Sequence, residues 1–223
     1  HITSKEDMMI LEKSPEKAAI LSQKDIGTVY GSPEGCFTIA DLIIFAVKPQ
    51  DANVLFETLK PLADNQQVFM SIMAGVKIET ICEALGVKKV IRAMPNLPAQ
   101  IGMGMTAFTS SNEVTRIELV MVQNLLNTTG KTIYVENEKA IDASTAISGS
   151  GPAYVFYFMD AMMKAAKEMG FNESEAELLV SQTFKGAVDL YNKNNFSCKE
   201  WIAKVSSKGG TTEAAMAFYQ NES

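Results

Sequence analysis

The chain has 223 residues and 47% of them are hydrophobic, so it is long enough to bury one or two sizeable cores. Its net charge of -6 argues against a nucleic-acid partner, and its apolar runs are shorter than the ~20 residues that span a bilayer. The single histidine is His1, which excludes a mechanism with an internal histidine base. The three cysteines lie far apart, without the spacing of metal ligands, and predict reduced thiols in a cytoplasmic protein.

The first 137 residues alternate between short apolar runs and helix-like segments. The runs predict strands at 7–12, 42–47, 68–73, 89–94, 105–109 and 132–135. Helices are predicted between several of them, at 14–21, 51–62, 77–85 and 113–126. This alternation is typical of an α/β fold, a mostly parallel sheet that helices cover on both faces.

The character of the chain changes at about Asn137, after which no strand-like run remains. Helices are predicted at 151–170, with Pro152 in the first turn and Gly170 at the stop, at 172–192, capped by Asn172, and at 197–205. We therefore expect an α/β domain at 1–137 and an all-helical domain at 138–223.

The first of these helices is apolar nearly all round, so it must be buried. Two interpretations are open: it is the central core helix of its domain, or it packs against a second subunit, and we favour the second.

Three predicted strands end in unusual residues. Ala46-Val47-Lys48-Pro49 places a cation and a rigid turn after one strand, Ala74-Gly75 admits close backbone approach after the next, and Met94-Pro95-Asn96 follows a third. Each alone is typical of an ordinary loop. Because ligands of open α/β sheets bind at the carboxyl ends of the strands, the three together predict one shared ligand cleft.

Lys13-Ser14 follows the first predicted strand, where dinucleotide-binding folds meet the adenosine ribose. A base and a hydroxyl suit a 2′-phosphate, whereas the preceding Glu12 suits a free 2′-hydroxyl. The same residues also form an ordinary helix start with Ser14 as cap, and the two interpretations are compatible. The Gly-rich phosphate fingerprint expected before such a strand is not in the sequence, so we expect a strand and this turn upstream of His1.

A loop at 206–212 reads Ser-Ser-Lys-Gly-Gly-Thr-Thr before a helix-forming run. Its glycines let backbone N–H groups turn inward, its hydroxyls add donors, and the helix adds a positive dipole end, which together favour a carboxylate or a phosphate. A plain capped turn is the alternative. The small residues at 148–152 are a second elbow, consistent with a domain junction.

The motifs AVKPQ, SIMAG, RAMPN, AISGSGPAYVF and SSKGGTT, in this order, resemble those of the pyrroline-5-carboxylate reductase family. The resemblance implies a Rossmann-type NAD(P)-binding domain and an all-helical dimerisation domain. It also implies reduction of 1-pyrroline-5-carboxylate to L-proline with NADPH, NADH being possible, in a homodimer or higher homo-oligomer. No metal, nucleic acid or membrane is implied.

The resemblance also implies roles for individual residues. The substrate carboxylate would lie against Ser207, Gly209, Gly210 and Thr211, and Thr212 would be the catalytic residue whose hydroxyl approaches the ring nitrogen. In the family this loop comes from one subunit and the nicotinamide site from its partner. The expected cofactor-binding residues are Lys13, Ser14, Ala46, Val47, Lys48, Pro49, Ala74, Gly75, Met94, Pro95 and Asn96.

The sequence departs from the family pattern in several places. Lys208 replaces the usual proline of the loop, Leu97 replaces a threonine, and Pro33 replaces an asparagine near the adenosine phosphate. Two other functions are considered. One is a hydroxy-acid oxidoreductase that uses Lys164 or Lys167 as its acid–base group, and the other is a binding or assembly module without catalysis.

Overall fold

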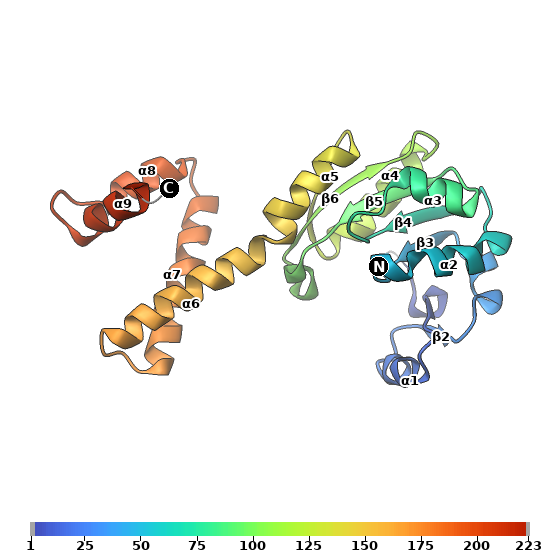
Figure 1. The fold of residues 1–223 in the computed structure, drawn as a ribbon, viewed down its shortest axis with the longest axis horizontal. Helices are drawn as coiled ribbons and strands as arrows, with labels where there is room; N and C mark the ends of the chain where they lie inside the picture. The colour runs from blue at the N-terminus through green and yellow to red at the C-terminus, as the bar shows by residue number, and fades with distance from the viewer. Residues whose placement is uncertain (1–2, 222–223) are drawn as a thin grey trace. The chain divides into compact units, whose positions relative to one another are not determined.

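The computed structural model describes residues 3–221, and packing divides them into two compact units (Figure 1). The first unit ends at Ala153 and the second begins at Tyr154. The first is a Rossmann-like α/β unit and the second is all helical, so the predicted fold class is confirmed. The predicted domain boundary at Asn137 stays a prediction.

The first unit contains two sheets. The smaller pairs β1 (Met9–Leu11) with β2 (Thr28–Tyr30) in parallel, joined by α1 (Pro15–Gln23). The larger has the order β3-β4-β5-β6-β7, with bounds Leu42–Phe45, Val68–Ser71, Val90–Met94, Gly104–Ser110 and Gly130–Tyr134. Only the β5–β6 pair is antiparallel among the pairs that the described residues form, which confirms a mostly parallel sheet. Within the described residues, β1 is hydrogen-bonded only to β2, and β3 only to β4.

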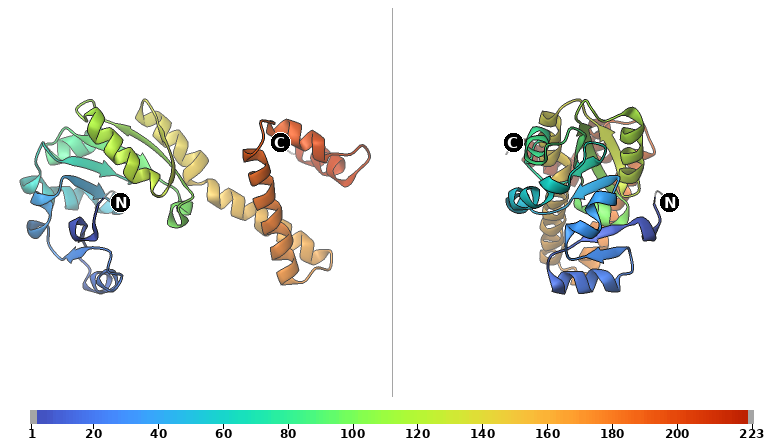
Figure 2. Two further views of the ribbon diagram at one scale, coloured as in Figure 1. Left: turned by 180° about the vertical axis from the view of Figure 1, so that it is seen from behind. Right: turned by 90° about the vertical axis from the view of Figure 1, so that its right-hand side faces the viewer.

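Helices cover both faces of the larger sheet because its strands are apolar on both sides. On one face, Phe69 of β4 packs with α2 (Ala52–Leu59) and α3 (Ile78–Leu85). On the other, Val68 and Met70 of β4 pack with α4 (Arg116–Asn127) (Figures 1 and 2). Short 3₁₀ helices fill the connections, at Lys5–Asp7, Pro33–Gly35, Phe37–Ile39, Pro49–Asp51, Lys60–Leu62 and Leu97–Ile101.

Besides these short 3₁₀ helices, three elements were not predicted from the sequence. They are β2, α5 (Glu138–Ser144) and a π-helix at Thr145–Gly149 that continues α5, labelled η7. β2 has only three residues, too few to show the alternation of apolar and polar residues that identifies a strand. α5 carries charged residues around one buried apolar side chain, Ile141, so it has no apolar stripe for the pattern to detect.

The second unit consists of α6 (Gly151–Glu168), which begins in the first unit, and of α7 (Glu173–Asn192), α8 (Cys198–Val205) and α9 (Thr211–Asn221). Asn172 and Ser197 cap α7 and α8 through reciprocal bonds with Glu175 and Glu200. Gly170 takes the positive φ of +101° that ends α6. The predicted helices are therefore confirmed in order and type.

The exposure of α6 argues against the interpretation of this helix as a central core helix of its own domain. None of its residues is buried, and Tyr154, Phe156, Tyr157 and Phe158 are 53–72% exposed. The chain itself does not cover this helix as a core helix would be covered. Among residues 3–221, none of the helices is both long and apolar enough to cross a membrane.

Candidate active site

The carboxyl ends of β3, β4 and β5 lie at one edge of the larger sheet because the three strands are parallel neighbours. The segments that follow them, at 46–49, 74–75 and 94–96, therefore lie at the same edge. The first two are exposed, and Met94, Pro95 and Asn96 are half-buried. The structure thus brings these predicted cofactor-binding residues together, while their binding role stays a prediction.

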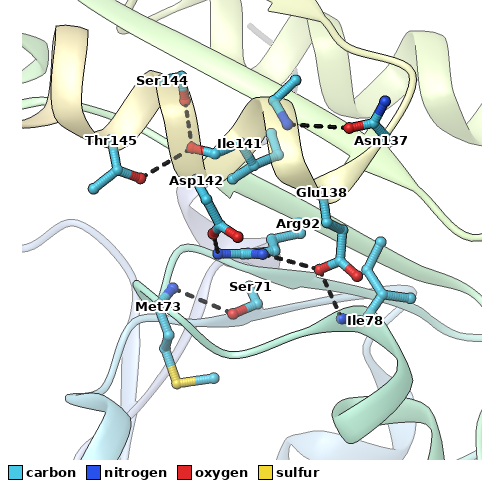
Figure 3. A network of polar contacts seen from close by, with 11 residues as sticks. Ser71, Met73, Ile78, Arg92, Asn137, Glu138, Ile141, Asp142, Ser144 and Thr145 are labelled. Atoms are coloured by element: carbon cyan, nitrogen blue, oxygen red, sulfur yellow. Dashed lines mark hydrogen bonds and ion pairs between the residues drawn. The ribbon is translucent and has the colours of Figure 1, made fainter.

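Gly75 and Ser71 shape the loop after β4. Gly75 has a φ of +74°, and no atom outside its own neighbours lies within 4 Å of where a Cβ would stand. Ser71 is fully buried, and its Oγ accepts a hydrogen bond of 3.2 Å from the N–H of Met73 (Figure 3). This bond holds the chain as it leaves β4, so that Gly75 presents open backbone at the edge of the sheet.

A buried arginine joins this sheet to α5, and the sequence analysis did not find it. Arg92 of β5 is 1% exposed and donates from Nη1 to Glu138 Oε1 at 3.0 Å and from Nη2 to Asp142 Oδ1 at 2.6 Å. Glu138 Oε1 also accepts from the N–H of Ile78, the first residue of α3, at 3.0 Å (Figure 3). One carboxylate therefore satisfies a buried guanidinium and a helix N-terminus together.

Asn96 has a second set of contacts at the same edge. Its Nδ2 donates to the carbonyl oxygen of Ser148 at 3.0 Å, and its Oδ1 accepts from the N–H of Met105 at 2.8 Å. Nearby, a Cβ on Gly149 would stand 3.3 Å from the methyl carbon of Met94. The end of β5 is therefore packed closely against the π-helix.

Lys13 and Ser14 lie at the carboxyl end of β1, in the smaller sheet. Ser14 caps α1 by accepting from the N–H of Lys17, which confirms the interpretation as a helix start. The Glu12 carboxylate turns back and accepts from the N–H of Ser14 at 2.8 Å. Lys13 is exposed, so its cation is available at this strand end.

The predicted substrate loop lies in the second unit, directly before α9. Gly209 has a φ of +74°, and its N–H donates to the Glu213 carboxylate at 2.7 Å. Gly210 donates to the carbonyl of Ser207 at 3.0 Å, and a Cβ on it would stand 2.5 Å from Ser207 Oγ. Ser207, Gly209 and Thr211 are exposed, and Gly210 and Thr212 are half-buried. The loop therefore presents a backbone N–H that binds a carboxylate, here one from its own helix.

Two family models match the chain in succession. The model for NADP oxidoreductase, coenzyme F420-dependent, matches residues 1–75, and the model for pyrroline-5-carboxylate reductase dimerisation matches residues 138–223. The two matches fall on the α/β and the helical parts of the chain respectively.

Relatives and solved structures agree with these matches. Pyrroline-5-carboxylate reductase 2 of Bacillus subtilis is 40% identical over 83% of this chain and 66% of that protein, so the chain spans slightly less than two thirds of it. The Aquifex aeolicus enzyme is 34% identical over 98% of this chain and 81% of its own length. The Coxiella burnetii reductase structure has a TM-score of 0.88 at 29% identity, covering 98% of this chain and 82% of that one. The Plasmodium falciparum pyrroline carboxylate reductase, solved with NADP bound, has a TM-score of 0.88 at 27% identity, covering 98% and 80%. The chain belongs to the pyrroline-5-carboxylate reductase family.

Proposed function

We propose that this protein reduces 1-pyrroline-5-carboxylate to L-proline by hydride transfer from NADPH, with NADH as the alternative donor. The observation that carries the proposal is its 34% identity to a pyrroline-5-carboxylate reductase over 98% of the chain. The strand ends at one sheet edge and the carboxylate-binding loop before α9 supply the two kinds of site that this reaction needs.

The cofactor half of the site consists of the strand-end residues of the first unit. Exposed Lys13 and the Ser14 hydroxyl suit a 2′-phosphate, and Glu12 is held by the Ser14 N–H. The open backbone at Gly75 fits the close approach of a dinucleotide. Ala46, Val47, Lys48, Pro49, Ala74, Met94, Pro95 and Asn96 complete this half. A bound nicotinamide supplies the hydride.

The substrate half consists of Ser207, Gly209, Gly210, Thr211 and Thr212. The N–H of Gly209 already donates to a carboxylate, that of Glu213, so a substrate carboxylate finds the same donor there once Glu213 swings away. The Thr212 hydroxyl bonds the ring nitrogen more strongly as the imine becomes an amine. A protonated cyclic imine needs little general-acid help, so catalysis rests on positioning and electrostatics.

The hydroxy-acid alternative is disfavoured by the state of its candidate lysines. Lys164 donates to Asp160 at 2.6 Å, and this hydrogen bond raises the pKa of the Lys164 ammonium, whereas an acid–base lysine needs a lowered pKa. Lys167 donates to Glu173 at 3.0 Å.

The exposed apolar residues of α6 support a homodimer, or a higher homo-oligomer, built on the helical domain at 138–223. The family match in the same residues supports it as well. The three cysteines are free thiols, which suits a cytoplasmic protein.

Steady-state kinetics of Thr212→Val and Gly210→Ala in the full-length gene product, with pyrroline-5-carboxylate and NADPH, test the proposal. Loss of one buried hydrogen bond formed in the transition state lowers kcat about 5- to 150-fold in Thr212→Val. Gly210→Ala pushes against Ser207 Oγ, so it raises the KM for the imine and spares the KM for NADPH.

Thr58→Val, on an exposed threonine of α2, is the matched control and keeps the wild-type constants. If Thr212→Val and Gly210→Ala also keep the wild-type kcat and KM, the loop is only a capped turn and does not bind the substrate.

A further inference from the structure

The end of β5 and the residues beyond it contact α5 and the π-helix at every second position. Arg92 binds the carboxylates of α5, Met94 lies against Gly149, and Asn96 binds the carbonyl of Ser148. Residues two apart on a strand share one face, so a single face of β5 and its extension carries all three contacts.

The contact at Asn96 has a specific cause in the backbone of the π-helix. An α-helical continuation would give the carbonyl of Ser148 the N–H of residue 152 as its partner, but residue 152 is a proline and has no N–H. The Nδ2 of Asn96 supplies the missing donor at 3.0 Å. The other end of the same amide accepts from the N–H of Met105 at the start of β6.

The π-helix has a defining backbone bond of its own. Its characteristic bond runs from the N–H of Ser150 to the carbonyl of Thr145, at 2.8 Å. π-helical turns are rare and are frequently found at functional sites. Asn96 and Met94 contact this one from the strand end.

We propose that Asn96 is a positioning residue for the reductase: its amide holds the π-helix against the end of β5 and so fixes Met94 and Pro95 in the cofactor half of the site. The inference rests on the proposed function for its kinetic consequence. Asn96 acts through Ser148 and Met105, whose backbone groups it joins, and this role is independent of any direct bond to the cofactor.

The test is Asn96→Asp, which has nearly the same shape. The carboxylate still accepts from the N–H of Met105 but offers no donor to the carbonyl of Ser148. We expect kcat to fall about tenfold or more, the effect of losing one hydrogen bond that holds the site, with the KM for NADPH changed by less than about twofold. Amide hydrogen exchange becomes faster at 145–151 and stays unchanged at Met105.

A second substitution tests the cause directly. Pro152→Ala restores an N–H that can bond the carbonyl of Ser148 within the helix, so adding it to Asn96→Asp recovers part of the lost kcat and of the lost protection. Asn127→Asp is the control, because among the described residues the Asn127 side chain bonds only through its Oδ1, which accepts from Thr132 Oγ1 at 2.7 Å and which aspartate retains. It leaves the kinetics and the exchange unchanged.

The outcomes separate the two proposals. Wild-type kcat and wild-type exchange in Asn96→Asp overturn the positioning role, and so does a lower melting temperature without a change in kcat. A wild-type protein without reductase activity refutes the proposed function, while the exchange pattern still decides whether Asn96 holds the π-helix.

Discussion

Among the glycines that the structure describes, Gly130 at the start of β7 has the least room for a side chain. It pairs with Gly104 of β6, and a Cβ built on Gly130 would stand 2.0 Å from the carbonyl oxygen of Gly104. Its φ is +149°. Glycine is therefore required there both by conformation and by the closeness of the neighbouring backbone.

Gly130→Ala is expected to lower the free energy of unfolding by at least about 3 kcal/mol, because β6 and β7 must separate to admit a methyl group. Gly102→Ala is the matched control. Gly102 has a φ of +72° but no atom within 4 Å of a Cβ, so its cost is the left-handed strain alone, about 1 kcal/mol. Urea unfolding measures the free energy of unfolding of both variants. Equal losses in the two would show that the closeness of the Gly104 backbone does not add to the cost at Gly130.

Glu118 gives one prediction about pH. Burial alone raises the pKa of its carboxyl, but hydrogen bonds from Lys89 and Thr115 outweigh burial and leave the pKa below its ordinary value of 4.5. A carboxyl with a lowered folded pKa stabilises the protein above the unfolded pKa, and this stabilisation is lost as the pH falls through the folded pKa.

Glu118→Gln should therefore reduce the free energy of unfolding by about 1 kcal/mol at pH 7, and the difference from wild type should vanish in acid, below the folded pKa. Asp25→Asn removes the exposed pair with Lys5, whose side chains are 51% and 77% accessible, and serves as the control with little effect. If Glu118→Gln lowers the free energy of unfolding equally at pH 7 and in acid, the lowered pKa of Glu118 does not stabilise the fold.

At the scale of elements, α5 is held by polar contacts as well as by the buried Ile141. Its Glu138 and Asp142 both bind Arg92, and the Nε of Arg92 is buried without a partner among the described residues. Glu138 alone also reaches α3. The cluster of Arg92, Glu138 and Asp142 therefore connects β5, α3 and α5. Glu138 joins α5 to both β5 and α3, whereas Asp142 joins α5 to β5.

We expect Arg92→Met to lower the free energy of unfolding by about 2–4 kcal/mol, since two carboxylates lose their buried cation. Glu138→Gln should cost less because its amide oxygen still accepts from Ile78. Asp142→Asn should cost least, since the Asp142 side chain is 56% accessible and water replaces the lost charge interaction. Urea unfolding of the three variants gives the order, and a cost for Asp142→Asn that equals that of Arg92→Met would refute it.

At the scale of the whole molecule, α6 of the helical unit exposes several large apolar side chains. Tyr157 and Phe158 are 72% and 59% exposed, and their rings contact each other edge to face. Apolar surface of this kind marks an interaction site in a folded protein. A second copy of the chain is the partner that the family match supports.

The double variant Tyr157→Glu/Phe158→Glu is expected to weaken dimerisation at least about 100-fold, because two carboxylates would have to be buried without partners. Light scattering across a dilution series measures this. Ile117→Glu is the control: Ile117 on α4 is 83% exposed and outside the predicted dimer surface, so its dimer persists. A double variant that dimerises like wild type would place the interface elsewhere.

The sequence by itself determined the order and type of most elements. Apolar runs placed β3, β4 and β5, and a capping serine with a proline placed the start of α1. These signals are local, since each depends on residues within one turn or one strand. The motifs at the strand ends were likewise readable, because parallel neighbours bring their carboxyl ends to one edge.

Only the tertiary structure decided how β6 pairs with β5, and which polar groups meet. Arg92 lies 46 and 50 residues from its two carboxylates, and Asn96 lies 52 residues from Ser148. No periodicity or spacing encodes such pairs, because the fold brings them together after the chain has turned back through β6, β7 and α5. The same holds for the π-helix, whose Ser148 carbonyl accepts from an amide at a distant strand end.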